Sequence, residues 1–345
     1  MMPCGRRKKR QVIMTVTNVI PGGRIAYLDN LKAFTIFCVV LGHAIQCYDT
    51  TGRMGGVYGA IYSFHMPLFM VISGYFLSKL LDMRIDRVVV RKARQLLMPV
   101  LSFSIVALCV SLLTRFDILR GQSFGQYVFG GDMWFLKYLF ASIVMACVSK
   151  LIFRNTVIAA LVPAIILISV SRVGIFRIYP FLWLGFCLNH YDYLVKRYVK
   201  ALLPISFLLF AISLLFWNVE YDYPHYRWIT VKDGVTFDWQ DMAIVAYRFW
   251  IGATGSLFFI TLFRLLGGST RMMRAVGTRT LGIYCLQIYL LEHLSDYLPK
   301  PDFVGVASVI FVVLVAVVET VLCCGVTMLL ERNRYLALCF LGKKL

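Results

Sequence analysis

Charged side chains are scarce in this chain of 345 residues. They make up 15% of it, against about a quarter in soluble domains, while 60% of the residues are hydrophobic. A chain of this composition cannot cover its apolar surface in a single soluble core. We therefore predict an integral membrane protein, with the lipid bilayer as the solvent for most of its surface.

Acidic residues are the scarcest charged type, with 17 Asp and Glu against 36 Lys and Arg and a net charge of +19. In a soluble protein this excess would indicate a nucleic-acid partner. Here the basic residues lie in short segments between apolar runs, as membrane topology requires. We expect no nucleic-acid partner.

Metal and disulfide signatures are also missing. No two of the ten cysteines have CxxC spacing, and most lie in or beside apolar runs. We interpret them as small buried residues and expect neither a bound metal nor a tightly bound cofactor. No linker rich in Gly or Ser divides the chain, and no repeat of fixed period is visible.

Long apolar stretches dominate what is present. About 20 apolar residues cross a bilayer as a helix. The chain has ten stretches that reach or approach this length: 30–48, 57–80, 95–114, 133–153, 156–171, 175–190, 201–217, 243–266, 280–298 and 303–330. The predicted fold is an all-α bundle of about ten transmembrane helices, covering residues 25–331.

The flanking segments are short and basic. We expect residues 1–24 to be a disordered cytosolic tail, within which Met14 is an alternative start, and residues 332–345 to be a second cytosolic tail. With both ends inside, cytosolic segments hold roughly three times as many Lys and Arg as outer segments. This asymmetry favours ten spans with cytosolic termini.

The first span carries three polar residues on one face. Lys32 and His43 are eleven positions apart, almost three helical turns or about 16 Å, and Asp29 lies on the same stripe. Polar residues within a span indicate a face turned toward protein or a cavity. Asp29 and Lys32 are also near enough to the cytosolic end to reach water there. A lone His in a span is often a hydrogen-bond partner between helices.

The second span supplies another histidine at similar depth. His65 precedes Pro67, which removes a backbone hydrogen bond and can open a cavity. A histidine is the natural general base for a hydroxyl at neutral pH, and it can also accept an acyl group transiently. The sequence leaves both roles open for His43 and His65.

Two arginines follow at the cytosolic mouth. Arg91 and Arg94 are neighbours on one helical face. Their guanidinium forks suit phosphate oxygens, although basic loops are also ordinary on the cytosolic side of a membrane. Together with Lys32 they offer a cationic mouth about 16 Å from His43, a gap comparable to an extended pantetheine arm.

These residues resemble a known family. Four features are similar to those of the acyltransferase-3 family of membrane O-acyltransferases, in its fucose 4-O-acetylase-like and exopolysaccharide acetyltransferase branch. They are the opening Tyr27 to Lys32, the spacing from Lys32 to His43, the run Phe64 to Phe69 and the Arg91–Arg94 pair. The sequence departs from that family at two positions. Thr280 stands where Ser is common, and Gln287 stands where a His often follows the tyrosine that corresponds to Tyr284.

The resemblance implies an O-acetyltransferase of the cell inner membrane that uses acetyl-CoA, or another acyl-CoA, as co-substrate. The acceptor would be a hydroxyl of a glycan or lipid-linked saccharide. His43 would be catalytic, with His65 and Asp29 as further catalytic candidates, and Lys32, Arg91 and Arg94 would lie near the donor. Candidates on the substrate side are Ser73, Tyr75, Trp134, Tyr284 and Gln287.

A different class of function fits the same spans. A polytopic transporter or flippase for a lipid-linked sugar would also have buried charges, including the mid-span Glu319. Such proteins often show two repeated halves with interrupted helices, and this sequence shows only one proline-kinked, histidine-bearing span.

Overall fold

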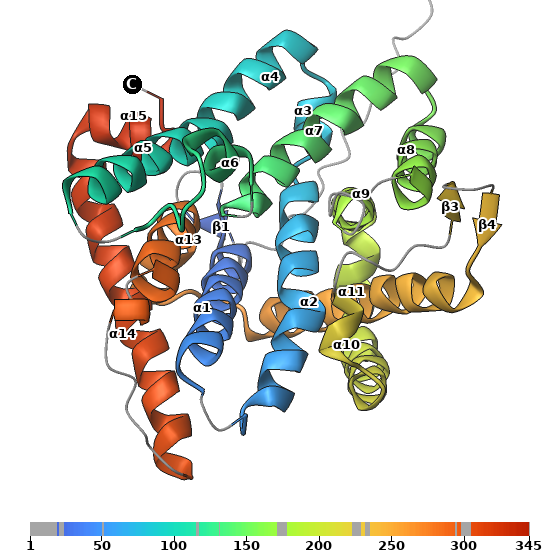
Figure 1. Cartoon of the computed structure of the whole chain (residues 1–345). Coiled ribbons are helices and arrows are strands. Elements are labelled where there is room, and N and C mark those ends of the chain that lie inside the picture. The colour runs from blue at the N-terminus through green and yellow to red at the C-terminus, as the bar shows by residue number, and fades with distance from the viewer. Residues whose placement is uncertain are drawn as a thin grey trace, which may run out of the picture.

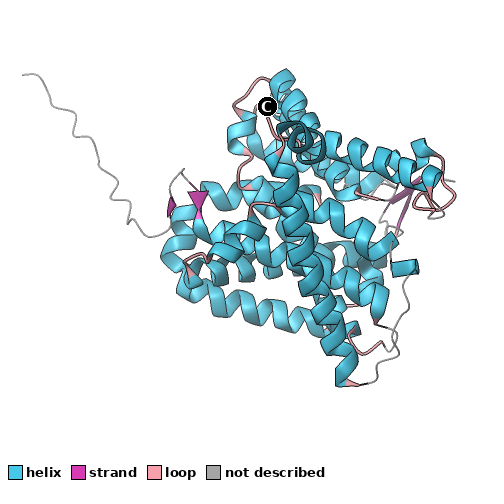
Figure 2. Ribbon diagram, turned by 90° about the vertical axis from the view of Figure 1, so that its left-hand side faces the viewer, coloured by secondary structure: helices cyan, strands magenta, loops and turns pink. Residues whose placement is uncertain are grey.

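The computed structural model describes residues 19–20, 24–49, 52–114, 117–130, 132–170, 178–222, 229–231, 235–293, 295–297 and 305–344. Figure 1 shows a bundle of helices, and Figure 2 shows that helix predominates throughout. The strands form two small antiparallel hairpins: β1 (Val19–Ile20) with β2 (Arg24–Ile25), and β3 (Ile229–Val231) with β4 (Val235–Phe237). The predicted all-α membrane fold is confirmed.

The first half of the bundle begins with two long helices and ends with a helical pair. Its elements are α1 (Ala26–Tyr48), α2 (Gly55–Gly74), α3 (Ser78–Leu81), α4 (Ile85–Lys92), the π-helix η1 (Ala93–Leu97), α5 (Met98–Leu113), α6 (Phe124–Phe129), α7 (Trp134–Phe153) and α8 (Thr156–Val170). Because α4, η1 and α5 run on without a break, the basic residues of α4 continue directly into a span.

The second half of the chain supplies the remaining helices of the bundle. Its elements are α9 (Tyr179–His190), α10 (Asp192–Leu215), the 3₁₀ turn η3 (Val219–Asp222), α11 (Trp239–Leu266), α12 (Arg271–Gly277), α13 (Thr280–Gln287), the π-helix η4 (Ile288–His293), the 3₁₀ turn η5 (Ser295–Tyr297), α14 (Val306–Arg332) and α15 (Arg334–Leu341). Residues 1–18, which hold Met14, lie outside the described residues.

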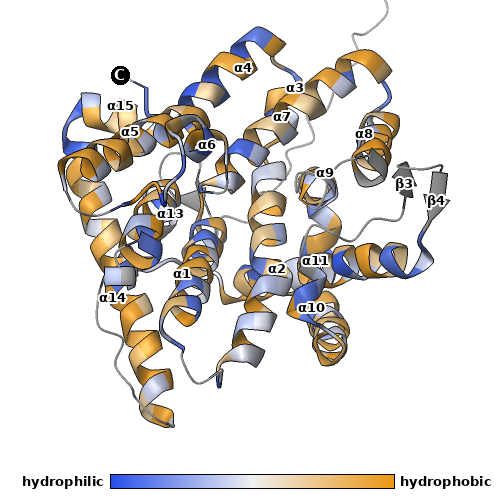
Figure 3. Cartoon of the chain, viewed as in Figure 1, coloured by the Kyte–Doolittle hydropathy of each residue, from blue (hydrophilic) through white to orange (hydrophobic). Residues whose placement is uncertain are grey.

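Seven helical segments among the described residues are long and apolar enough to cross a membrane. Three predicted spans correspond to shorter helices, α8, α9 and α13 with η4, so the count of ten crossings stays a prediction. Large apolar side chains point outward from the long helices, for example Leu113, Leu208 and Val318. In Figure 3, α5 and α14 are coloured mostly as hydrophobic residues. These features are those of a multi-pass membrane protein.

The helices α1 and α2 lie side by side at the centre of the bundle (Figure 1). Around them, α1 packs against α11, α12, α13 and α14, and α2 packs against α9 and α11. A Cβ at Gly74 would overlap the carbonyl oxygen of Leu182, and one at Gly185 would overlap that of Val71. Glycine at these two positions lets α2 and α9 approach closely.

The C-terminal segment is part of the folded body. Residues 334–341, which the sequence suggested as a tail, form α15 and pack against α5 and α14. Ala337 and Leu341 are buried, and the Phe340 ring meets the Phe103 ring edge-on with centroids 5.1 Å apart. Asn333 caps the helix through its side chain.

Candidate active site

One cavity of the candidate site, which we call the outer cavity, has a volume of about 360 Å³. It lies between α1, α2, α7 and the segment α13–η4. His43 from α1 and His65 from α2 both line it, together with Asp132, Trp134 and Glu292. The structure therefore brings together the two histidines that the sequence placed at similar depth. Trp134, a predicted candidate on the substrate side, lines the same cavity.

His43 faces a carboxylate that the sequence analysis did not select. Its Nδ1 atom lies 2.9 Å from Oε1 of Glu292, at an angle poorer than that of a regular hydrogen bond. Both side chains are about a quarter exposed or less, at 22% and 25%. A carboxylate on Nδ1 orients an imidazole and stabilises its protonated form, which leaves Nε2 for chemistry.

His65 is held differently. It is buried, and its Nδ1 lies 2.7 Å from the backbone carbonyl oxygen of Ile61, one helical turn earlier. Since a carbonyl oxygen only accepts, Nδ1 carries the proton and Nε2 of the neutral ring is an acceptor. The Tyr62 ring packs edge-on against the imidazole, with centroids 4.9 Å apart. His65 thus can accept a proton or a hydrogen bond at Nε2, but in this tautomer it cannot donate one there.

A second histidine–carboxylate pair lies beside the first. Nε2 of His293 is 3.0 Å from Oδ2 of Asp132, and the Tyr127 hydroxyl is 3.5 Å from the same nitrogen. Burial alone would raise the pKa of Asp132, but hydrogen bonds from His293 and Tyr127 and the charge of Arg120 hold that pKa below its ordinary value. The carboxylate on the cavity wall is therefore ionised at neutral pH.

Residues 117–120, between α5 and α6, are hydrogen-bonded to η4 and η5. Arg120 donates to the backbone carbonyl of Glu292 at 2.8 Å, and the backbone N–H of Asp117 donates to the Tyr297 hydroxyl at 3.0 Å. These bonds connect residues 117–120, which precede α6, to the segment that supplies Glu292.

An inner cavity of about 420 Å³ continues from the outer one. Met66 and Tyr284 line both cavities, so the two cavities adjoin at these side chains, and we call this boundary the constriction. Lys32, Ser73 and Arg91 line the inner cavity. Lys32 thus lies on the inner side of the constriction and His43 on the outer side, as their spacing on one helical face predicts.

A third cavity, of about 820 Å³, opens beyond the inner one. Arg91, Gln95 and Leu281 line both, and Arg94 lines the third. The three cavities therefore share walls in sequence, from the basic end of α4 to the histidines.

Three predicted site residues lie away from these cavities. Asp29 is buried where α1 packs on α12, and its Oδ2 has no hydrogen-bond partner among the described residues. Tyr75 donates to Asp192 at 3.0 Å, in a cluster with Arg264. Gln287 is fully buried in α13 and lines none of the three cavities.

Two further features concern other residues. Glu319 accepts a hydrogen bond from Sγ of Cys323 at 3.2 Å within α14, so this mid-span carboxylate is outside the series of cavities. Among the described residues, no group of three or more His, Cys, Asp or Glu side chains is arranged to hold a metal ion.

A family model for an acyltransferase domain, the acyltransferase-3 model, matches residues 25–328. The chain belongs to the acyltransferase-3 family. This confirms the resemblance seen in the first two spans, and it confirms the predicted enzyme class, an acyltransferase. Membership in this family also agrees with the multi-pass architecture described above.

Two curated relatives of this acyltransferase-3 chain are nodulation proteins. It is 36% identical over 176 residues to "Nodulation protein NolL" of Sinorhizobium fredii, covering 46% of this chain and 47% of the relative. It is 29% identical over 177 residues to the protein of that name in Mesorhizobium japonicum, covering 46% of each. The aligned part spans about half the length of these relatives. No solved structure matches the chain.

Proposed function

We propose that this protein transfers an acetyl or other short acyl group from cytosolic acyl-CoA to a hydroxyl of a cell-surface or exported glycan, across the cell inner membrane. The observation that carries the proposal is the series of adjoining cavities from Arg91 and Arg94 to His43. The acyl end of a thioester would enter past Lys32, while its phosphates stay at the basic end.

The acceptor would approach from the outer cavity. Nε2 of His43 takes the proton of the acceptor hydroxyl as its oxygen attacks the thioester carbonyl. Glu292 at Nδ1 stabilises the imidazolium that forms. The C–S bond then breaks, the CoA thiolate leaves, and the proton returns from His43 to the sulfur. A variant of this route passes the acyl group through an imidazole nitrogen.

The outer cavity suits a saccharide. Trp134 offers a flat apolar face, with its ring 5.5 Å from that of Tyr138, and Asp132 offers an ionised acceptor for hydroxyl groups. Asp132 and Glu292 together give this cavity a negative wall, which disfavours an anionic ligand there. A neutral polyhydroxyl acceptor therefore fits better than the phosphate end of the donor.

The test is transfer of labelled acetyl from acetyl-CoA to membrane glycans by the purified protein in detergent. The wild type should transfer without a sealed membrane, whereas a transporter would show no transfer under these conditions. His43→Ala should abolish transfer, and His190→Ala, an exposed histidine at the end of α9, is the matched control. Full activity of His43→Ala would refute the catalytic assignment.

The donor end has its own test. Replacing Arg91 and Arg94 with Ala should raise the KM for acetyl-CoA by about tenfold or more, because charge-assisted hydrogen bonds to phosphate are lost. An unchanged KM would contradict the placement of the donor phosphates. Analysis of glycan O-acetylation in a deletion strain would identify the acceptor.

A further inference from the structure

The third cavity is strongly cationic. Six basic side chains and two carboxylates line it: Arg87, Arg91, Arg94, Arg279, Lys343, Lys344, Asp86 and Glu331. Oδ2 of Asp86 lies 3.1 Å from Nη2 of Arg84, a residue that does not line the cavity. Glu331 is therefore the carboxylate that neutralises cations of the cavity lining. This excess of positive charge is more than the Arg91–Arg94 pair alone would give.

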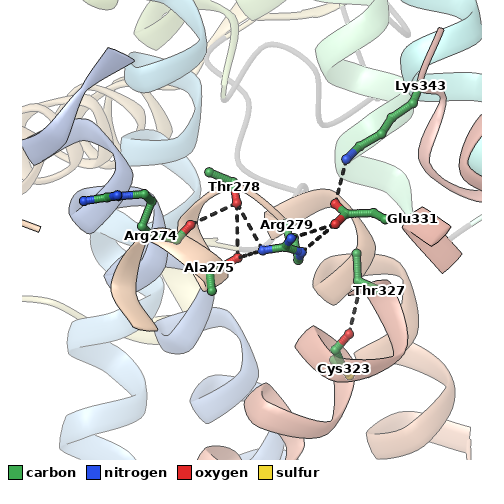
Figure 4. Close-up of polar contacts among 8 residues, drawn as sticks. All are labelled: Arg274, Ala275, Thr278, Arg279, Cys323, Thr327, Glu331 and Lys343. Atoms are coloured by element: carbon green, nitrogen blue, oxygen red, sulfur yellow. Dashed lines mark hydrogen bonds and ion pairs between the residues drawn. The ribbon is translucent and has the colours of Figure 1, made fainter. Parts of the chain in front are cut away.

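Glu331 binds two cations that come from distant parts of the chain (Figure 4). Its Oε2 lies 2.7 Å from Nη2 and 2.8 Å from Nε of Arg279, which stands between α12 and α13. Its Oε1 lies 2.6 Å from Nζ of Lys343, beyond α15. One carboxylate therefore holds a guanidinium and an ammonium side by side.

Both cations are built into position. Arg279 also donates to the backbone carbonyl of Ala275 at 3.0 Å. The backbone N–H of Lys343 donates to the carbonyl of Ala337 at 3.1 Å, which closes the end of α15. Gly342 has a positive φ of 60°, and a Cβ there would lie 2.5 Å from the carbonyl oxygen of Arg94. The C-terminal turn is thus seated on the helix that carries the Arg91–Arg94 pair.

We propose that Arg279 and Lys343 form a subsite for a terminal phosphate monoester, that of the ribose of the CoA donor, and that Glu331 is its internal counter-ion when no donor is bound. This inference rests on the proposed function. A phosphate monoester carries up to two negative charges and three acceptor oxygens, against one charge and two oxygens of a carboxylate. It therefore competes with Glu331 for the same two cations.

The position in the series of cavities supports this subsite. The third cavity adjoins the inner cavity through Arg91 and Gln95, on the side away from the constriction at Met66 and Tyr284. The acyl group and the ribose phosphate are opposite ends of the donor. A donor with its acyl carbon near His43 therefore has its most anionic end in this cavity.

The experiment compares acetyl-CoA with acetyl-dephospho-CoA, which lacks only the ribose phosphate. In the wild type, the KM for the dephospho donor should be about tenfold higher, as expected for loss of one charge-assisted phosphate contact. In Lys343→Ala the ratio of the two KM values should fall toward one. Lys200→Ala, an exposed lysine on α10 outside the cavity, should keep the wild-type ratio.

An equal KM for both donors in the wild type would overturn the proposal. So would a wild-type ratio in a folded Lys343→Ala protein. Should Lys343→Ala not fold, inhibition of the wild type decides: adenosine 3′,5′-bisphosphate should inhibit about tenfold more strongly than adenosine 5′-monophosphate. Equal inhibition would also refute the subsite.

A lipid headgroup could present phosphate to the same cations. If it does, Lys343→Ala would lose activation by anionic phosphatidylglycerol in proteoliposomes while keeping the wild-type donor ratio, and this result would overturn the assignment to the donor. Absence of transfer from both donors would instead indicate failure of the proposed function. The two failures are therefore distinguishable.

Discussion

His43 and Glu292 join the first long helix to the π-helical end of α13–η4, with Nδ1 and Oε1 2.9 Å apart. The pair lies on the wall of the outer cavity, beyond the constriction at Met66 and Tyr284. In the proposed mechanism, the carboxylate orients the histidine that would activate the acceptor hydroxyl. Most of what we expect of the chemistry depends on this contact.

Glu292→Gln is expected to lower kcat by about 100-fold, within the range for loss of assistance to a general base. Glutamine keeps the size of the side chain but removes the charge that stabilises the imidazolium. The KM for acetyl-CoA should change little, since the proposed site for the donor phosphates lies elsewhere. Steady-state transfer kinetics measure both quantities.

The control for this change is Glu220→Gln, because Glu220 is exposed in η3 and lines none of the three cavities. It should retain wild-type kcat. If Glu292→Gln is equally active, the carboxylate only holds η4 in place and His43 works without it.

Met66→Trp should block the constriction between the inner and outer cavities. A larger ring there would keep the acyl carbon from reaching His43, and misplacement by about 1 Å can cost about 100-fold in rate. We expect a fall in kcat with a smaller change in the KM for acetyl-CoA. Thermal unfolding of the detergent-solubilised variant shows whether the ring also strains the packing.

Met328→Trp is the comparison, since Met328 lies on α14 with 47% of its surface exposed. It should leave transfer unchanged. Wild-type kcat in a folded Met66→Trp variant would mean that the acyl group takes another path.

Much of the fold followed from composition and apolar runs, because a bilayer fixes the length and polarity of a span. Each of the ten predicted stretches contains helix. The C-terminal helix α15 was not predicted, since eight residues after a basic turn are too short for periodicity to show, and its packing on α5 is a tertiary contact.

The site was predictable where a single helix sets the geometry, as for Lys32 and His43. Ser73 and Tyr75 show the limit: residues two apart on a helix point to opposite faces, so Ser73 lines the inner cavity and Tyr75 meets Asp192. Glu292 was not among the predicted site residues. Its direction depends on the π-helical turn of η4, which ordinary helical periodicity does not anticipate.

Acid should weaken the tie between Asp132 and His293. Because the folded protein holds the pKa of Asp132 below its ordinary value, the ionised carboxylate contributes stability that is fully present above the unfolded pKa. That contribution is lost as the pH falls through the folded pKa. The melting temperature of the wild type should therefore fall more steeply than that of Asp132→Asn between about pH 5 and pH 3.

The same pair of proteins provides the control. At neutral pH, Asp132→Asn should melt below the wild type, and the two curves should converge in acid as the wild-type carboxylate is protonated. Parallel curves over the whole range would show that Asp132 does not supply this pH dependence.

The close contact of α2 and α9 predicts opposite effects for two glycine-to-alanine changes within helices. In Gly185→Ala the new methyl group meets the carbonyl of Val71, so α2 and α9 must move apart. We expect a loss of about 1–3 kcal/mol in unfolding free energy. Gly325 on α14 has nothing within 4 Å of such a methyl group, so Gly325→Ala should raise helix stability by up to about 1 kcal/mol. Unfolding in mixed micelles measures both changes. Equal effects would mean that helix propensity, and not the approach of α2 to α9, sets the stability of this part of the bundle.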